Sequence, residues 1–394
     1  MYDVIVVGAR CAGAPTAMLM ARAGYRVLLL EKAHFPKDKL SSHYLHQPGV
    51  ALLDRWGVLE KLRAAGCTPI DRVSCETAGV RLVGSLLPAD GHTTTYAPRR
   101  YVLDPILAAA AVEAGAEFRE GCTVTGLLQE DGRVTGVKYR TAGGEFTERA
   151  RLVVGADGMR STVARHVQAP VIVEHAPMSC TYYSYWEGLN ASHWELYERT
   201  GRSLGVVPTN DGRTLVMAYF PQAEFRQIRK DAQAAYLEAI RTTSPELSDR
   251  LSAARQAERL YGTGEQLNFV RQSAGPGWAL VGDAAHHKDS IAARGITDAF
   301  RQVQMLTDYI GTDLHDPKAL TAACDRYARD LEEKFVEAYH GTLSVAELKV
   351  TEEKLAVVRA ISPHQELVDR YFGVLSGVCA AEEFYNEELE RLVG

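Results

Sequence analysis

The chain has 394 residues, 46% of them hydrophobic and 24% charged, which is the balance of an ordinary soluble globular protein; at roughly 150 residues per domain, two to three domains are expected. Its 44 basic and 50 acidic side chains give a net charge of −6, which disfavours nucleic acid or an anionic membrane as a partner, because both need a clustered basic surface. The seven cysteines are odd in number and contain no C-x-x-C pair, which argues against a disulfide framework and a structural zinc site. The N-terminus has no basic signal-peptide region and no apolar run approaches the roughly 18 residues of a membrane span, so a cytoplasmic location is expected.

The chain begins with the pattern of a βαβ unit. Residues 3–7 form a continuous apolar run, as a buried parallel strand does, and a Gly- and Ala-rich turn follows at 8–14. A helix rich in Ala, Met and Leu then reaches about Arg22, and residues 26–31 predict a second parallel strand. Beyond it we predict, in order, a loop at 34–49, a helix at 50–65, strands within 70–97, a helix at 104–114 and a strand meander at 117–155.

The second half of the chain changes character. Aromatic and β-branched residues dominate 171–222, which predicts an antiparallel sheet, and residues 223–260 have a helical period. A short buried strand is expected at 278–281, and the chain is almost wholly helical in pattern from 293 onward.

The segment Gly8-Ala9-Arg10-Cys11-Ala12-Gly13 stands where a dinucleotide fingerprint belongs, directly after a strand and at the start of a helix. In such a motif the outer glycines allow a tight turn and close packing, and the middle one admits a pyrophosphate to backbone amides. Here the middle position is Arg10, whose side chain must either point away from the phosphates or wrap them, and its charge favours the second. Glu31, followed by Lys32, ends the next strand, where an acid can accept hydrogen bonds from ribose hydroxyls and would repel a 2′-phosphate. The motif therefore predicts FAD or NAD rather than NADP, with these cofactor-binding residues: Gly8, Arg10, Ala12, Gly13, Glu31 and Lys32.

Two further motifs also follow strands directly. Gly155–Ser161 contains Asp157 and Gly158, and the segment Gly282–His286 leads to a helix that opens near Gly295. Asp283 can accept a hydrogen bond from a ribityl hydroxyl. The helix start presents free amides and a positive dipole end, which suit the N1–C2=O edge of a reduced flavin. The cofactor-binding residues predicted here are Asp157, Gly158, Gly282, Asp283, Gly295 and Ile296.

In this order and spacing, the three motifs resemble those of FAD-dependent monooxygenases of the aromatic-hydroxylase type, a superfamily that also contains flavin-dependent halogenases and geranylgeranyl reductases. The resemblance covers about residues 1–330 and implies an α/β fold: a Rossmann-like FAD-binding domain, an inserted antiparallel-sheet substrate domain and a helical C-terminal segment. It also matches Arg100 to a helix-start arginine that contacts the flavin side chain. The predicted FAD-binding domain is discontinuous (1–75, 100–175 and 268–330), the substrate domain comprises 76–99 and 176–267, and the C-terminal segment is 331–394.

The working residues are expected beside the flavin. In similar proteins the loop after the second strand runs along the flavin, which makes His43 and His46 the catalytic candidates; each serves as a general base, as a substrate hydrogen-bond partner, or only to tie the loop down. Tyr183 and Tyr185 alternate at strand spacing, so they either roof a substrate pocket or pack on the core. His286, for which a structural role is favoured, and Asp289 complete the predicted pocket residues, and no third ligand accompanies His286-His287 to make a metal site.

The resemblance implies NAD(P)H- and O₂-dependent hydroxylation or epoxidation of a mostly apolar, aromatic or polycyclic small molecule through a flavin C4a-(hydro)peroxide, as in secondary metabolism. The halogenase signature W-x-W-x-I-P and the reductase signature Y-x-W-x-F-P are absent, but Asp289-Ser290 and Ala292 stand where the flavin-facing loop usually has prolines and a glycine. Three alternatives therefore stay open: a reductase or dehydrogenase of a C=C or C–C bond without oxygen insertion, a halogenase, and a non-enzymatic flavin carrier. Electrons come either from NAD(P)H directly or through a separate flavin reductase, and the chain is expected as a monomer or homodimer with neither nucleic acid nor membrane as a partner.

Overall fold

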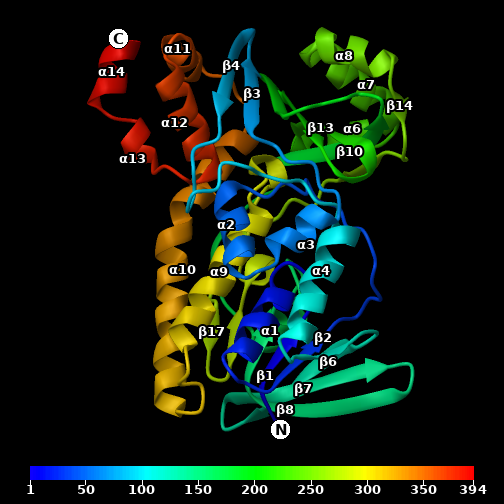
Figure 1. Ribbon diagram of the computed structural model, residues 1–394, viewed down its shortest axis with the longest axis vertical. Coiled ribbons are helices and arrows are strands. Elements are labelled where there is room, and N and C mark those ends of the chain that lie inside the picture. The colour runs from blue at the N-terminus through cyan, green and yellow to red at the C-terminus, as the bar shows by residue number, and fades with distance from the viewer.

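The computed structural model describes all 394 residues and contains two large sheets, one below the other in Figure 1. The lower sheet has the strand order β17-β18-β8-β1-β2-β5, and β6 and β7 extend it as a meander from β8. Strands β18, β8, β1, β2 and β5 run parallel to one another. The bounds are β1 (Tyr2–Val7), β2 (Val27–Leu30), β5 (Glu117–Arg119), β6 (Thr123–Glu130), β7 (Arg133–Thr141), β8 (Gly144–Gly155), β17 (Ala274–Gly275) and β18 (Trp278–Leu280).

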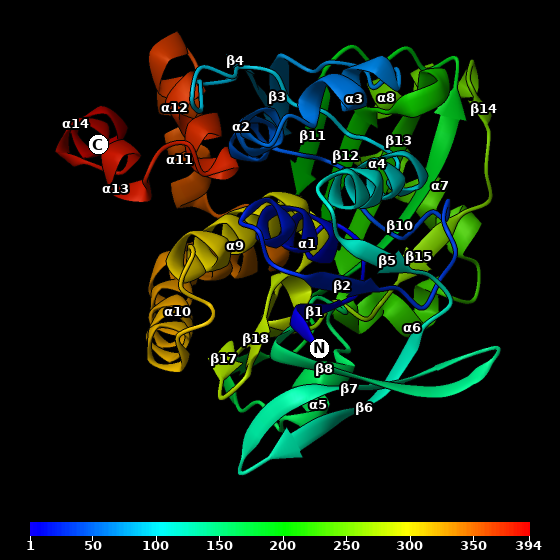
Figure 2. The same ribbon diagram turned by 60° about the horizontal axis from the view of Figure 1, so that its bottom comes forward.

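Helices cover the lower sheet, which explains the continuous apolar runs of its strands. All four residues of β2 and five of the six residues of β1 are buried, as expected for parallel strands with both faces covered. Helix α1 packs against α4 and α9, and α10 packs against α9, as Figure 2 shows from below. These helices are α1 (Gly13–Arg22), α4 (Arg100–Glu113), α9 (Gly295–Ile310) and α10 (Pro317–Ala346), with α2 (Gln47–Arg55) and α3 (Leu59–Ala64) above them and α5 (Thr162–His166) against the meander.

The upper sheet has the order β14-β10-β13-β12-β11-β3-β4, with β15 also paired to β10. It is antiparallel except where β11 meets β3. Side chains alternate between two faces: Tyr183 and Tyr185 join the core cluster on the inner face, and Tyr182 and Trp186 join the outer cluster under α7 and α8. The bounds are β3 (Arg72–Thr77), β4 (Val80–Ser85), β10 (Ser179–Glu187), β11 (Trp194–Arg199), β12 (Arg202–Pro208), β13 (Arg213–Pro221), β14 (Arg255–Gln256), β15 (Tyr261–Thr263), α6 (Phe225–Ile228), α7 (Ala232–Thr243) and α8 (Pro245–Ser252).

A small third sheet and the C-terminal helices join the two halves. The third sheet has the order β19-β16-β9. The C-terminal helices pack into the same core cluster as the inner face of the upper sheet, through residues such as Val358 and Phe372. The bounds are β9 (Val171–His175), β16 (Asn268–Arg271), β19 (His286–His287), α11 (Glu352–Ile361), α12 (Gln365–Ser376), α13 (Ala381–Phe384) and α14 (Glu387–Val393), and four 3-10 turns occupy Asn210–Gly212, Gln222–Glu224, Gly282–Ala284 and Ser290–Ala292.

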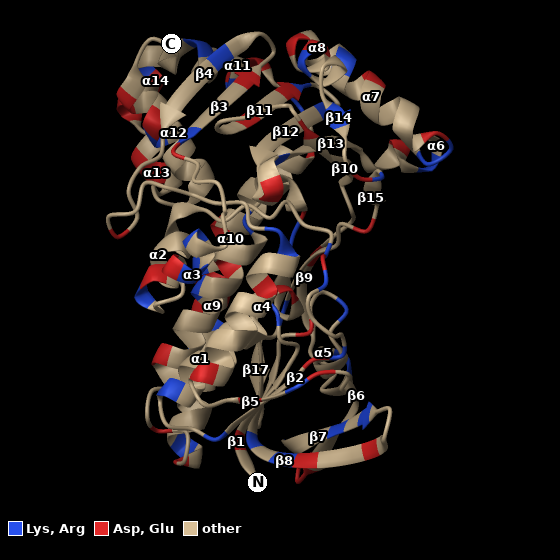
Figure 3. Cartoon of the chain, turned by 45° about the vertical axis from the view of Figure 1, so that its right-hand side comes forward, with Lys and Arg blue, Asp and Glu red and all other residues tan.

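The predicted α/β architecture, with a Rossmann-like domain, a separate sheet domain and C-terminal helices, is confirmed. Two predicted domain boundaries fall inside elements: residue 75 lies within β3 and residue 330 within α10. Strand β3 pairs with β4 and β11, so the whole strand belongs to the upper sheet. Helix α10 is one unbroken helix of 30 residues, so it continues through the boundary at residue 330. Basic and acidic residues are interspersed along the chain in both halves of the molecule (Figure 3). None of the helices combines the length and the apolar character that a membrane span requires.

Candidate flavin and substrate site

The three sequence motifs meet at one edge of the lower sheet. In the register of this sheet Val7 of β1 is paired with Gly155 of β8, and Gly155 is paired with Leu280 of β18. Each motif starts at one of these residues or within two residues of it, so all three lie together at the carboxyl ends of parallel strands. The chain continues from β1 to β2 on one side and from β8 to β18 on the other, and open α/β sheets bind their ligands at such a point.

Glycines allow the motifs to touch. Gly8 has φ +97°, and a Cβ added there would lie 2.5 Å from the Ala156 carbonyl oxygen. A Cβ on Gly13 would lie 1.7 Å from the carbonyl oxygen of Gly8, and one on Gly282 would lie 2.9 Å from the Cβ of Ala12. No side chain caps α1; the Ala14 amide donates to the Arg10 carbonyl at 3.0 Å and Pro15 has no N–H, so the amide of Gly13 is the one left free for a pyrophosphate in this first turn. The tight turn and close packing expected of a dinucleotide fingerprint are therefore present.

Glu31 fixes the turn from the neighbouring strand. Its buried carboxylate accepts hydrogen bonds from the amides of Ala9 at 2.9 Å and Ala33 at 3.0 Å. Lys32, beside it, is exposed. An acid held against the fingerprint in this way is placed to accept ribose hydroxyls, and for both residues contact with the cofactor remains a prediction.

Arg10 bends back over the turn rather than into solvent. Its Nη1 donates to Asp104 at 2.5 Å and to the Lys37 carbonyl at 3.4 Å, and its guanidinium lies 5.2 Å from the centre of the Phe35 ring. Its Nη2 is buried and has no hydrogen-bond partner. A buried donor without a partner costs free energy until an acceptor arrives, so this atom fits a phosphate oxygen of the dinucleotide.

Arg100 begins α4 and shares the same carboxylate. Its Nε donates to the fully buried Asp104 at 2.8 Å, so one acid holds both Arg10 and Arg100. Burial acts to lower the pKa of Arg100, but nearby acidic groups, Asp283 of the third motif among them, raise it above its ordinary value. Arg100 therefore lies between the first and third motifs, and its contact with the flavin side chain remains a prediction.

The aspartates of the second and third motifs differ in their hydrogen bonding. Asp157 accepts hydrogen bonds from Ser161 Oγ at 2.5 Å and from the Thr162 amide at 2.6 Å, so it is occupied at the start of α5, and the adjacent Gly158 has φ +81°. Asp283 is exposed and forms no hydrogen bond or ion pair within the protein, which leaves it free for a ribityl hydroxyl. Helix α9 begins at the exposed Gly295 and the buried Ile296 without a side-chain cap, so its first amides are available to an anionic flavin edge. The free donor on Arg10, the free carboxylate of Asp283 and two uncapped helix starts fit FAD.

On the substrate side, His43 and Tyr185 form a buried pair. His43 Nε2 lies 2.5 Å from the Tyr185 hydroxyl, and His43 Nδ1 is buried without a partner. Burial, reinforced by the charges of Arg99 and Arg100, holds the pKa of His43 well below its ordinary value, so the imidazole is neutral. Burial also raises the pKa of Tyr185, so its hydroxyl keeps its proton.

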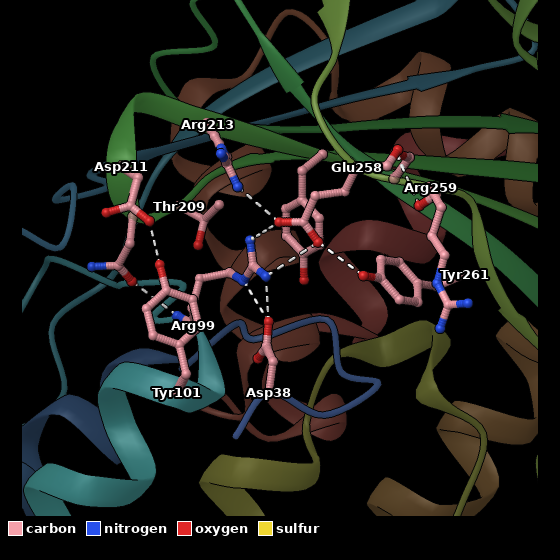
Figure 4. Close-up of polar contacts among 12 residues, drawn as sticks. Asp38, Arg99, Tyr101, Thr209, Asp211, Arg213, Glu258, Arg259 and Tyr261 are labelled. Carbon is pink, nitrogen blue, oxygen red and sulfur yellow. Dashed lines mark hydrogen bonds and ion pairs between the residues drawn. The ribbon is translucent and has the colours of Figure 1, made fainter. Parts of the chain in front are cut away.

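Arg99 supports this pair from the other side. Its guanidinium lies 3.7 Å from the centre of the Tyr185 ring. Figure 4 shows it between two carboxylates, Asp38 of the loop after β2 and Glu258 of the strand-connecting segment after β14, at 2.7 Å (Nε to Asp38 Oδ2) and 2.9 Å (Nη1 to Glu258 Oε1). Glu258 also accepts from Tyr261 at 3.0 Å. Arg99 thus ties the loop that carries His43 to the sheet that carries Tyr185.

His46 lies in an aromatic setting. Its ring is 4.8 Å from that of Tyr44 and 5.6 Å from that of Trp194, centre to centre, and its Nε2 lies 3.3 Å from the Ala292 carbonyl. Burial, with a smaller contribution from the charge of Arg294, lowers the pKa of His46 to about 3. His46 is therefore a neutral group that bridges the His43 loop and the loop before α9.

The other predicted pocket residues, Tyr183, Asp289 and His286, lie in three different environments. Tyr183 lies on the inner face beside Tyr185 and Tyr261. Asp289 accepts from Ser179 Oγ at 2.7 Å, from Gln266 Nε2 at 3.1 Å and from the Ile291 amide at 3.1 Å, so its carboxylate anchors the loop before α9. His286 is buried with neither ring nitrogen hydrogen-bonded, and it packs against Phe335 and Tyr339 away from the His43 pair. Their contact with a substrate remains a prediction.

Comparison with known sequences decides the family. The family described as FAD binding domain matches residues 1–329. The chain belongs to this family of FAD-binding proteins.

Curated relatives of this flavoprotein catalyse different reactions. It is 27% identical over 345 residues to 6-methylpretetramide 4-monooxygenase of Streptomyces rimosus, covering 85% of this chain and 78% of the relative. It is also 27% identical over 399 residues to digeranylgeranylglycerophospholipid reductase 1 of Methanopyrus kandleri, covering 96% and 99%. Among solved structures, a flavin-dependent brominase matches with a TM-score of 0.80 at 20% identity over 99% of this chain and 97% of that one, which shows a shared fold. The predicted membership is confirmed, as is the assignment to FAD-dependent oxidoreductases.

Two features of the flavoprotein were not predicted from its sequence. Arg99, rather than its neighbour Arg100, joins the two sheets. In addition, Lys288 is buried in the loop before α9 and pairs with Asp298 at 2.5 Å. The sequence offered two signals: two consecutive arginines at a helix start, and a lysine inside an otherwise buried motif. Neither signal identifies a partner, because Arg99 pairs with residues far away in the chain and Lys288 pairs with a residue of the next helix.

Proposed function

We propose that this flavoprotein is a monooxygenase that hydroxylates or epoxidises a mostly apolar aromatic or polycyclic small molecule. The observation that carries the proposal is the buried His43–Tyr185 pair with one unpartnered ring nitrogen, set among apolar and aromatic side chains of the inner face. Bound FAD supplies the reaction with O₂; the protein binds, orients and shields the substrate.

The pair can handle a substrate hydroxyl in either tautomer. When the Tyr185 hydroxyl donates to Nε2, the one N–H of neutral His43 stands on Nδ1 and can donate to a substrate oxygen. When Nε2–H donates to the Tyr185 oxygen instead, Nδ1 can accept a proton from a substrate hydroxyl. The lowered pKa makes His43 a weak base, so its part is to hydrogen-bond a phenol and orient the ring for hydroxylation.

Halogenation is the alternative that a lysine would have to support, because a halogenase needs a lysine with a reactive amine between flavin and substrate. Lys37 and Lys39 lie exposed on the loop after β2, and burial and nearby cations lower the pKa of Lys39. The buried Lys288 donates to Asp298, so its amine is engaged within the protein. NAD(P)H as the electron donor is part of the proposal, and the absence of a second nucleotide fingerprint does not decide between direct reduction and a partner reductase.

The test is stopped-flow absorbance of the FAD-loaded protein, reduced without oxygen and then mixed with O₂ in the presence of phenolic ligands. We expect a transient that is neither reduced nor oxidised flavin, whose lifetime changes with the ligand. His43→Ala should keep the transient and lose most of the ligand response, whereas His34→Ala on the exposed loop should behave as the wild type. A direct return to oxidised flavin, with and without ligands, would refute the proposal.

A reductase is the second candidate, because the archaeal reductase relative aligns over nearly the full length of both chains. It predicts oxidation of the reduced flavin by an alkene ligand in the absence of oxygen. The same instrument measures this without O₂, and a monooxygenase should show no such oxidation.

A further inference from the structure

A cavity of about 490 Å³ lies beside α9. Its walls come from α2, the 88–90 loop, α9, α10 and the turn after α12. Helix α9 packs against both α2 and α10, and the three run side by side in Figures 1 and 2. The volume falls in the range of small-molecule sites, and Leu52, Met305 and Phe335 make part of its wall apolar.

Arg301 is the charged side chain of this wall that has no partner within the protein. Its guanidinium lies 5.2 Å from the centre of the Phe335 ring and forms neither a hydrogen bond nor an ion pair in the protein. The other charged groups of the lining are occupied: Asp90 pairs with Arg55, Asp308 accepts from Gln304, and Lys334 pairs with Asp330. Arg301 alone keeps all of its donors free.

Two further cations, Lys288 and Arg294, lie near Arg301 around Asp298. Asp298, one helical turn before Arg301, is shared by Lys288 at 2.5 Å and Arg294 at 3.6 Å. Burial favours neutral Asp298, but the cations outweigh it and hold its pKa below the ordinary range. Counting Arg301, three cations face one carboxylate.

Gly377 is the residue of the cavity wall that lies against Arg294. Gly377 lines the cavity, and a Cβ added there would lie 2.3 Å from a guanidinium nitrogen of Arg294. Arg294 is 9% exposed, and its Nε has no partner. Arg301, which lines the cavity, and Arg294, which lies behind Gly377, therefore both have unused donors near the same wall.

We propose that this cavity binds a small organic anion, with its carboxylate or phosphate on Arg301 and its apolar part against Leu52, Met305 and Phe335. Guanidinium groups bind both oxyanions through paired hydrogen bonds. The shared chemistry has two sources, a free organic acid or the phosphates of a nicotinamide dinucleotide, and the probes below separate them.

The experiment is isothermal titration calorimetry on the oxidised, FAD-loaded protein with phenylacetate, inorganic phosphate, NAD⁺ and NADP⁺ as separate probes. We expect at least one probe to bind, and Arg301→Gln to weaken it about tenfold or more. Arg301→Lys should recover part of the loss, and Arg241→Gln, on the exposed surface of α7, should have no effect. Ala89→Phe should weaken binding by filling the cavity without changing a charge.

Phenylacetate binding would identify an organic acid as the ligand, and NADP⁺ or NAD⁺ binding would identify the dinucleotide. Binding that is equal in the wild type, Arg301→Gln and Ala89→Phe would overturn the proposal, as would no binding by any probe. Since no turnover is measured, the result is independent of the reaction proposed above.

Discussion

The flavin edge and the inner face of the upper sheet are built in opposite ways. At the flavin edge, Gly8, Gly13 and Gly282 bring backbone segments into contact, and the groups left for the ligand are mainly amides, with Arg10 and Asp283 added. At the inner face the polar groups are side chains, His43 and Tyr185, which lie 142 residues apart in the chain.

The contrast predicts that relatives with different reactions share the flavin edge and differ at the inner face of the upper sheet. Backbone amides at strand ends bind a dinucleotide whatever the substrate is, so relatives with different reactions can share them. The pocket side chains can change without disturbing that edge. Five experiments test whether the flavin edge and the inner face of the upper sheet are independent of each other.

Gly13→Ala should abolish FAD retention, because its Cβ would lie 1.7 Å from the carbonyl oxygen of Gly8 and neither backbone can move far. The measurement is FAD absorbance after gel filtration. Gly341→Ala, inside the C-terminal part of α10 with nothing within 4 Å of the added Cβ, is the control and should retain FAD fully. Normal retention by Gly13→Ala would mean that the flavin edge is not a tight backbone site.

Asp298→Asn should lower the free energy of unfolding by about 3–5 kcal/mol, because it leaves the buried Lys288 charge without its carboxylate. Chemical denaturation measures the loss. Glu366→Gln removes an acid from an exposed pair with Arg370 and should change little. An equal, small effect for both would show that Lys288 loses its charge freely inside the protein.

Arg99→Gln should cost about 2 kcal/mol of stability, since Asp38 and Glu258 lose their shared cation. FAD affinity should stay within about threefold of the wild type, because the fingerprint is untouched. Fluorescence titration with FAD and denaturation give the two readouts, and Arg241→Gln serves as the exposed control. A collapse of FAD affinity would make the two regions one cooperative unit.

Arg10→Gly should weaken FAD binding about tenfold, because the free Nη2 donor and its charge disappear from the pyrophosphate site. The dissociation constant is obtained by titrating the FAD-free protein. Arg22→Gly, at the far end of α1, is the comparison. An unchanged constant would mean that Arg10 only braces Asp104.

Stability should fall as the pH drops from about 6.5 toward 3, because the pKa of His46 is about 3 in the folded chain, below that of an unfolded histidine. The unfolded chain then binds the extra proton, so stability is complete above pH 6.5 and declines by at most about 1.4 kcal/mol per pH unit for this residue. His46→Phe should make the decline shallower, and His34→Phe should not. Identical slopes in all three proteins would contradict a buried neutral His46.

By itself the sequence determined the α/β fold, the order of the motifs and the FAD-binding family, because glycine turns after apolar strands are local patterns with one structural solution. It also placed His43, Tyr185 and Arg100 among the candidates. Only the tertiary structure decided that Tyr185 meets His43, that Arg99 rather than Arg100 spans the two sheets, and that Lys288 is matched by Asp298. These contacts depend on how separate elements pack, which no local spacing encodes.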